Sequence, residues 1–210
     1  MNWQRLHGYL GYQSLMLGAV VLVTCAALGW AAQRTHGPIL AAEAQDLRNN
    51  LSRVLPHGSY DNDLLQARAQ IDGPDGPLDV YRATLQGKPV AAIFAVHGRG
   101  YAGDIEVLLA ISPEGALLGA RVLKHKETPG LGDKIDVEKN PWITRFQGLS
   151  LGNPPVERWA VKKDGGDFDQ FAGATITPRA VVKEIRGGLE FFASHRQQLF
   201  GETLAAGESQ

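Results

Sequence analysis

The chain has 210 residues and a formal net charge of -1, with 20% charged and 44% hydrophobic residues. This composition is typical of a folded protein, and the length allows one domain with appendages. The near-neutral charge gives no electrostatic footprint for nucleic acid, so we exclude a nucleic-acid-binding function. The single cysteine, Cys25, excludes an internal disulfide and a paired-cysteine metal or redox site.

Residues 15–32 form an uncharged apolar run that follows a short N-terminal tail, residues 1–14. At about 1.5 Å per residue, a helix of this length spans about 27 Å, which is enough to cross a lipid hydrocarbon core. Tyr12 lies before the run and Trp30 lies near its end, as an aromatic belt would predict. We therefore predict a transmembrane anchor that contacts the lipid bilayer.

Two other interpretations of this run remain open. A cleaved signal peptide also carries an apolar region, but that region is usually only about 7–15 residues long. A buried core helix is the third interpretation. Arg5 precedes the run while Arg34 and Arg48 follow it, so the distribution of positive charge does not decide the orientation.

Residues 33–78 are predicted to form a juxtamembrane helix and a connection. Apolar residues recur there at helical spacing: Leu40, Ala44, Leu47, Leu51, Val54 and Leu55. Pro56 and Gly58 then end the helical pattern. Residues 59–77 are rich in Asp, Gly and Pro, which indicates an irregular connection.

Residues 79–200 are predicted to form one domain that begins with two β-hairpins. The expected strands are Val80–Leu85 and Val90–Val96, followed by Ile105–Ile111 and Ala116–Leu123. Turn residues join each pair, Gln86–Lys88 in the first and Ser112–Gly115 in the second. Adjacent hairpins indicate an antiparallel sheet rather than a doubly wound parallel one.

The second half of the domain is predicted to be less regular until its last helix. Asn140 is expected to cap a short helix over 141–146, and residues 159–162 to form a short strand. A C-terminal helix is expected to have Thr177 as N-cap and Pro178 as its first residue. Its apolar face comprises Val181, Val182, Ile185, Leu189 and Phe192. Residues 201–210 are predicted to form a small, polar tail. Taken together, the elements predict one membrane helix followed by one α+β domain.

The sequence DQFAGATIT, residues 169–177, places a glycine-containing loop directly before the last helix. The first turn of a helix has unpaired N–H groups and a partial positive charge, so it stabilises an anion. Thr175 lies beside this end of the helix, and Gly173 and Ala174 leave the approach open. Spacing alone also fits a simpler interpretation, in which Gly173 serves a turn and the threonines cap a helix.

A second turn-rich segment, HKETPGLGDK, occupies residues 125–134. Gly130 and Gly132 would let the backbone approach a flat ligand closely. Glu127 and Thr128 carry groups that can hydrogen-bond the polar edges of such a ligand. Spacing alone fits an ordinary surface loop equally well.

Both segments resemble motifs of known flavoproteins. Residues 169–175 resemble the D-x-x-[ST]-G-A-T signature of flavinylated FMN-binding domains, with Ala172 in place of the usual Ser or Thr. Residues 125–132 resemble the H-x-E-T-P-G-L-G loop of RnfG, the G subunit of the Rnf ion-translocating electron transport complex. The C subunit of the sodium-pumping NADH:quinone oxidoreductase shares the ETPGLG core. The resemblance covers residues 95–195.

The resemblance implies one FMN, joined by a phosphoester to Thr175 by a flavin transferase that uses FAD. The other cofactor contacts that it implies are Gly173, Ala174, Ile176 and Thr177 around the attachment site, Glu127, Thr128, Leu131 and Gly132 in the second loop, and Lys162 toward the phosphate. Exposed lysines are the rule, so a surface role for Lys162 is the competing interpretation. The six histidines are scattered, and no metal site is expected.

The function implied is that of an electron-relay protein without turnover of its own. Its expected partners are the other membrane and redox subunits of an Rnf-type complex. The expected location is the bacterial inner membrane, with the FMN domain on the periplasmic side. Two alternatives are the C subunit of the sodium-pumping quinone reductase and a flavin-free, membrane-tethered binding or scaffold module.

Overall fold

The computed structural model describes residues 10–56, 58–74 and 76–201. Residues 1–9 of the predicted N-terminal tail and 202–210 of the predicted C-terminal tail lie outside these ranges. The chain divides into two compact units, residues 1–47 and 48–210, which are described separately below.

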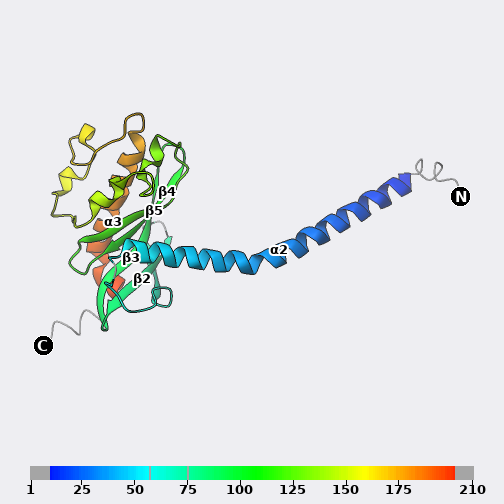
Figure 1. Cartoon of the computed structure of the whole chain (residues 1–210), viewed down its shortest axis with the longest axis horizontal. Helices are drawn as coiled ribbons and strands as arrows, with labels where there is room; N and C mark the ends of the chain where they lie inside the picture. The colour runs from blue at the N-terminus through cyan, green and yellow to red at the C-terminus, as the bar shows by residue number, and fades with distance from the viewer. Residues whose placement is uncertain (1–9, 57, 75, 202–210) are drawn as a thin grey trace. The chain divides into compact units, whose positions relative to one another are not determined.

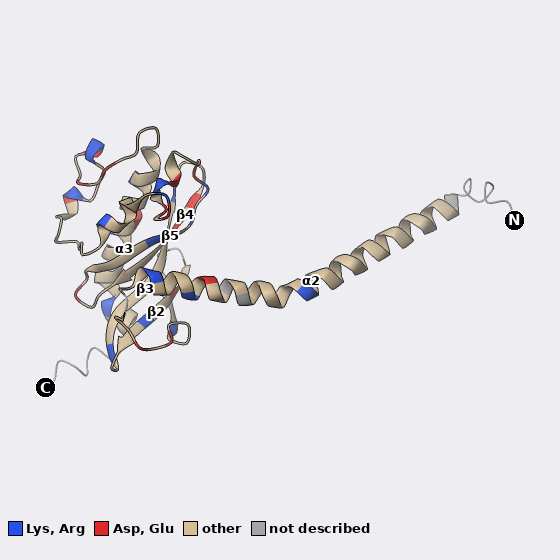
Figure 2. Cartoon of the chain, in the orientation of Figure 1, with Lys and Arg blue, Asp and Glu red and all other residues tan. Residues whose placement is uncertain are grey.

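The first unit consists of most of helix α2, which runs from Leu10 to Val54. Within the described residues, this one helix is long and apolar enough to cross a membrane. Side chains 15–32 are all exposed, so the interpretation as a buried core helix is wrong. Figure 2 shows no charged residue on the drawn helix before Arg34.

The predicted juxtamembrane helix is present as the C-terminal part of α2, which continues without a break through Pro38 to Val54. Its final turns belong to the second unit, where Leu51 and Val54 are buried. There the backbone of Gly119 packs directly against Val54. A side-chain carbon added at position 119 would lie only 2.1 Å from the Val54 carbonyl oxygen. The apolar stripe predicted from the sequence therefore packs on the domain where the helix ends.

The second unit is built on a five-stranded antiparallel sheet in which every strand pairs with its neighbours in sequence. Its strands are β1 (Arg68–Gly73), β2 (Gly76–Leu85), β3 (Lys88–Arg99), β4 (Asp104–Ile111) and β5 (Leu117–Lys124). Both predicted hairpins are confirmed, β2–β3 and β4–β5. In the second turn, the N–H of Gly115 donates to the carbonyl of Ser112 at 2.9 Å.

Strand β1 was missed, because residues 59–77 were predicted to be irregular. Ile71 is the only β-branched residue in this strand, and its neighbours are polar or small. Pairing with β2 stabilises the strand instead: Arg68 forms an ion pair with Asp79 at 2.8 Å, and Gln70 bonds the same carboxylate. Such cross-strand contacts depend on the partner strand and cannot be read from the local pattern.

Helix α3, Ile176–Phe200, lies along one face of the sheet (Figure 1). Val107 and Leu109 of β4 join its core cluster. Leu108 and Ala110 are also buried, although alternation directs them to the opposite face. Both faces of the sheet are therefore covered, and the predicted α+β class with a C-terminal helix is confirmed.

Four short 3₁₀ helices lie between β5 and α3: η1 (Gly132–Ile135), η2 (Pro141–Phe146), η3 (Val156–Arg158) and η4 (Lys162–Asp164). The predicted cap of η2 is confirmed, because the Asn140 side chain accepts a hydrogen bond from the N–H of Trp142 at 2.9 Å. The predicted strand at 159–162 is wrong. Trp159 and Val161 are buried as anchors of an irregular segment, and Val161 makes only an isolated bridge to Phe168.

The start of α3 also differs from the prediction. Thr175 holds the N-cap position, Ile176 is the first helical residue, and Pro178 comes third. Thr177 cannot act as the cap because it is fully buried and its hydroxyl bonds Glu127. The observed boundary places Thr175 at the N-terminus of the helix.

Candidate functional site

The two motif segments meet at a single cavity of about 280 Å³. It is lined by Tyr101, Glu127, Thr128, Leu131, Gly132, Gly173, Ala174, Thr175, Ile176 and Thr177. Every site residue predicted from the sequence lines this cavity except Lys162. The fold thus brings together two loops that lie about 45 residues apart in the chain.

Thr175 presents its hydroxyl at the N-terminus of α3 without using it to cap the helix. The residue is half-buried, and its side chain makes no capping hydrogen bond. An N-cap hydroxyl usually accepts a bond from an N–H of the first turn. Because this one does not, those N–H groups and the helix dipole remain available to an anion attached at Thr175.

Glu127 joins three segments of the cavity wall and is itself only 5% exposed. Its Oε2 accepts a hydrogen bond from the Thr177 hydroxyl at 2.5 Å, and its Oε1 accepts one from the N–H of Ala102 at 3.1 Å. The carboxylate thus ties the ETPGLG loop to α3 and to the turn that precedes β4. These contacts engage both of its oxygens within the protein.

Gly132 lines the cavity and also packs against the Glu127–Thr177 contact. A side-chain carbon at this position would lie 2.7 Å from Glu127 Oε2 and 2.9 Å from Thr177 Oγ1. The missing side chain therefore makes room for the Glu127–Thr177 contact.

Asp169, the first residue of the 169–175 motif, forms ion pairs with two basic side chains. Lys162 Nζ lies 2.6 Å from Asp169 Oδ1, and Arg145 bonds the other carboxylate oxygen. The indole N–H of Trp142 donates to the Asp169 carbonyl at 2.9 Å. Lys162 therefore holds the loop that carries Thr175 and does not line the cavity.

The hydrogen bond from Lys162, aided by the charge of Arg145, holds the pKa of Asp169 below its usual range. A neighbouring pair acts similarly, because the hydrogen bond from Arg179 lowers the pKa of Asp164. Arg179 lies in the first turns of α3 and bonds both oxygens of Asp164, at 2.6 and 2.9 Å. Ion pairs thus fix the loop before α3 at both Asp164 and Asp169.

The lowered pKa of Asp169 predicts a loss of stability in acid. A carboxyl group with a lowered folded-state pKa stabilises the fold above its unfolded pKa, and this contribution disappears as pH falls through the lowered value. We expect Asp169→Asn to lower the urea unfolding midpoint at pH 6, and the difference from wild type to shrink below about pH 4. Asp104→Asn, at an exposed carboxylate of β4, is the control. A difference for Asp169→Asn that stays constant with pH would contradict the assignment.

Tyr101 was not predicted as a site residue, although it lines the cavity and is 74% exposed. It lies in a tight turn in which the N–H of Gly100 donates to the carbonyl of Gly103 at 2.8 Å. The Gly-Tyr pair before a strand was the available signal. An exposed aromatic ring beside Leu131, which is 43% exposed, provides an apolar rim for a flat ligand.

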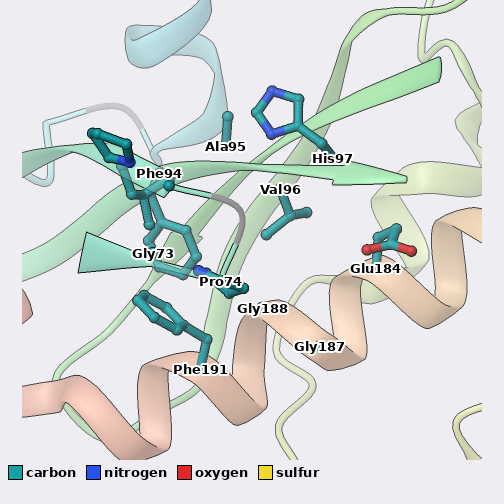
Figure 3. Close-up of a pocket in the computed structure, with 13 residues that line it drawn as sticks. Gly73, Pro74, Phe94, Ala95, Val96, His97, Glu184, Gly187, Gly188 and Phe191 are labelled. Carbon is teal, nitrogen blue, oxygen red and sulfur yellow. The ribbon is translucent and has the colours of Figure 1, made fainter. Parts of the chain in front are cut away.

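A second cavity of about 280 Å³ lies between the β1–β2 turn, β3 and α3. Figure 3 shows Phe94 and Phe191 with Pro74 beside them, and His97 and Glu184 at the opposite end. Neither motif segment contributes to it. We therefore assign the candidate site to the first cavity.

Comparison with known proteins supports this choice. The FMN-binding domain family matches residues 100–190, a range that contains every residue lining the first cavity. The G subunit of the ion-translocating oxidoreductase complex of Cereibacter sphaeroides is 49% identical over 186 residues, covering 88% of this chain and 85% of that protein. The same protein of Stutzerimonas stutzeri is 49% identical over 185 residues, covering 88% and 81%. This chain belongs to the family of these G subunits.

Among solved structures, this member of the G-subunit family is similar to NqrC of Shewanella oneidensis. The TM-score is 0.48 and the sequence identity 23%, over 68% of this chain and 72% of that one.

The residues of this G-subunit homologue fit an FMN group on physical grounds. Thr175 offers a hydroxyl with no capping bond at a helix N-terminus, where a phosphate is stabilised. Tyr101 and Leu131 offer exposed apolar surface at the same cavity for a flat ring. A phosphate and a ring can therefore be held by residues that line the same cavity.

Proposed function

We propose that this chain is an electron-transfer subunit of an ion-translocating oxidoreductase complex and carries FMN joined through its phosphate to Thr175. The observation that carries the proposal is the Thr175 hydroxyl, which lies without a capping bond at the start of α3. It lies in the same cavity as the ETPGLG loop. Membership of the G-subunit family supports the assignment over the C subunit of the sodium-pumping enzyme.

The attachment requires FAD and a flavin transferase. In that step the Thr175 oxygen forms a bond to the phosphorus on the FMN side of the FAD pyrophosphate. The bond from this phosphorus to the bridging oxygen breaks, and AMP leaves with the electron pair. The hydroxyl proton passes to a base or to solvent, so the products are the phosphoester and AMP.

Different residues of the chain would hold different parts of the cofactor. The first turn of α3 stabilises the phosphate through its N–H groups and helix dipole. Tyr101, Thr128 and Leu131 bound the part of the cavity that would receive the ring. Lys162 and Asp169 hold the loop that presents Thr175. When bound, FMN supplies the capacity to accept and donate electrons, and the protein supplies position and electrostatics.

Helix α2 is proposed to anchor the domain in the bacterial inner membrane, with the FMN domain in the periplasm. The uncharged exposed surface of residues 15–32 supports the anchor. A covalent bond would keep the cofactor in a compartment from which free FMN diffuses away. The proposed partners are the other redox and membrane subunits of an Rnf-type complex, and the flavin transferase during maturation.

Intact mass and in-gel fluorescence test the proposal. The full chain is produced with and without a flavin transferase and analysed after denaturation. We expect the matured chain to be heavier by one FMN less one water and to fluoresce in the gel, whereas the chain made without transferase does neither. A matured chain of unmodified mass would favour a flavin-free scaffold.

A further inference from the structure

Glu127 is the one carboxylate that is buried among the described residues. Both of its oxygens accept hydrogen bonds, one from the hydroxyl of Thr177 and the other from the backbone N–H of Ala102. An ionised carboxylate, which only accepts, satisfies both contacts, with Thr177 and Ala102 as the two donors.

No basic side chain of the described residues forms an ion pair with this carboxylate. Glu127 takes part in no ion pair among residues 10–56, 58–74 and 76–201, whereas Asp164 and Asp169 nearby are both paired. Its low exposure also keeps water and salt ions from screening it fully. The cavity wall thus carries a carboxylate that has no ion-pair partner among the described residues and lies beside the N-terminus of α3.

The carboxylate is also fixed in place. A side-chain carbon at Gly100 would lie 2.3 Å from Oε1, and one at Gly132 would lie 2.7 Å from Oε2. Backbone therefore packs against the two oxygens from both sides. Glu127 cannot turn toward a ligand without losing its bonds to Thr177 and Ala102.

We propose that Glu127 is a fixed electrostatic group that lowers the reduction potential of the flavin in this cavity, and not a residue that hydrogen-bonds the ring. This inference rests on the proposed function, since it requires flavin at Thr175. Reduction adds negative charge to the flavin, and a negative charge in the same cavity wall opposes it. Charge near the ring is one of the means by which a protein tunes a flavin.

The test is the midpoint potential of the full chain, matured with a flavin transferase and titrated with dithionite while flavin absorbance is followed. Glu127→Gln removes the charge and keeps both contacts. The amide oxygen can accept from Ala102, and the amide nitrogen can donate to the Thr177 hydroxyl. We expect this variant to fold, to take up covalent flavin and to show a more positive midpoint potential than wild type.

Two further variants separate charge from structure. Thr177→Val removes the hydrogen bond to Oε2 but keeps the carboxylate, so we expect lower thermal stability of the flavin-free chain and a smaller rise in potential than in Glu127→Gln. Glu106→Gln removes a carboxylate of β4 that pairs with Lys124 outside the cavity, and its potential should match wild type.

Several results would overturn the inference. These are an unchanged potential in Glu127→Gln, an equal rise in Thr177→Val, or failure of Glu127→Gln to take up flavin. Absence of covalent flavin from the wild-type chain, seen by mass before any titration, would instead refute the proposed function. The two failures are therefore distinguishable.

Discussion

Thr175→Val is expected to eliminate covalent flavin while leaving the domain folded. Valine matches threonine in shape but has no hydroxyl to join to the phosphate. The native hydroxyl makes no capping bond, so its loss leaves no helix N–H newly unpaired. In-gel fluorescence and intact mass after co-expression with the transferase give the readout, and thermal unfolding should remain close to that of the unmodified wild-type chain.

Thr84→Val is the matched control, because Thr84 is a half-buried threonine on β2 outside the cavity. It should retain full flavin attachment. Covalent flavin in Thr175→Val at the wild-type level would show that another residue is the acceptor. Loss of flavin from both variants would point to a general folding effect.

Trp142→Ala is expected to destabilise the domain by about 3–5 kcal/mol, the usual cost of truncating a buried aromatic residue. Trp142 is 4% exposed and packs edge-on against Phe146 and Phe171, with ring centroids 5.1 and 5.2 Å apart. Its indole N–H also bonds the carbonyl of Asp169. The loop that presents Thr175 would lose both its packing and this anchor, so flavin loading should fall as well.

Trp142→Phe separates these two contributions. It keeps an aromatic ring in the cluster but leaves the Asp169 carbonyl without its donor. We expect a smaller loss, about 1–3 kcal/mol, from the unsatisfied carbonyl. Guanidinium unfolding of the detergent-solubilised full chain, followed by near-ultraviolet circular dichroism, measures both variants. Equal losses for alanine and phenylalanine would contradict the packing assignment.

The regular part of the fold was predictable because its signals are local. The turn at Ser112–Gly115, the cap at Asn140 and the apolar face of α3 each depend on neighbouring residues. Strand β1 depends instead on contacts with β2, and the segment at 159–162 on burial of Trp159 in an aromatic cluster. Neither leaves a clear periodic pattern in its own sequence.

The site was predictable as two motifs, but their arrangement required the fold. Spacing alone allowed Thr177 to cap the helix and Gly132 to admit a flat ligand. The structure assigns both residues to the Glu127 contact, which joins positions 50 residues apart. Lys162 likewise has a role only through Asp169, since the sequence cannot show which carboxylate a lysine meets.

Peptide mapping of the chain matured with its own modification machinery tests the central claim most directly. Tryptic cleavage after Lys163 and Arg179 gives a peptide of residues 164–179, which contains Thr175 and Thr177. The account predicts that this peptide carries the mass of one FMN less water and that fragmentation places it on Thr175. An unmodified peptide 164–179, or one modified at Thr177, would contradict it.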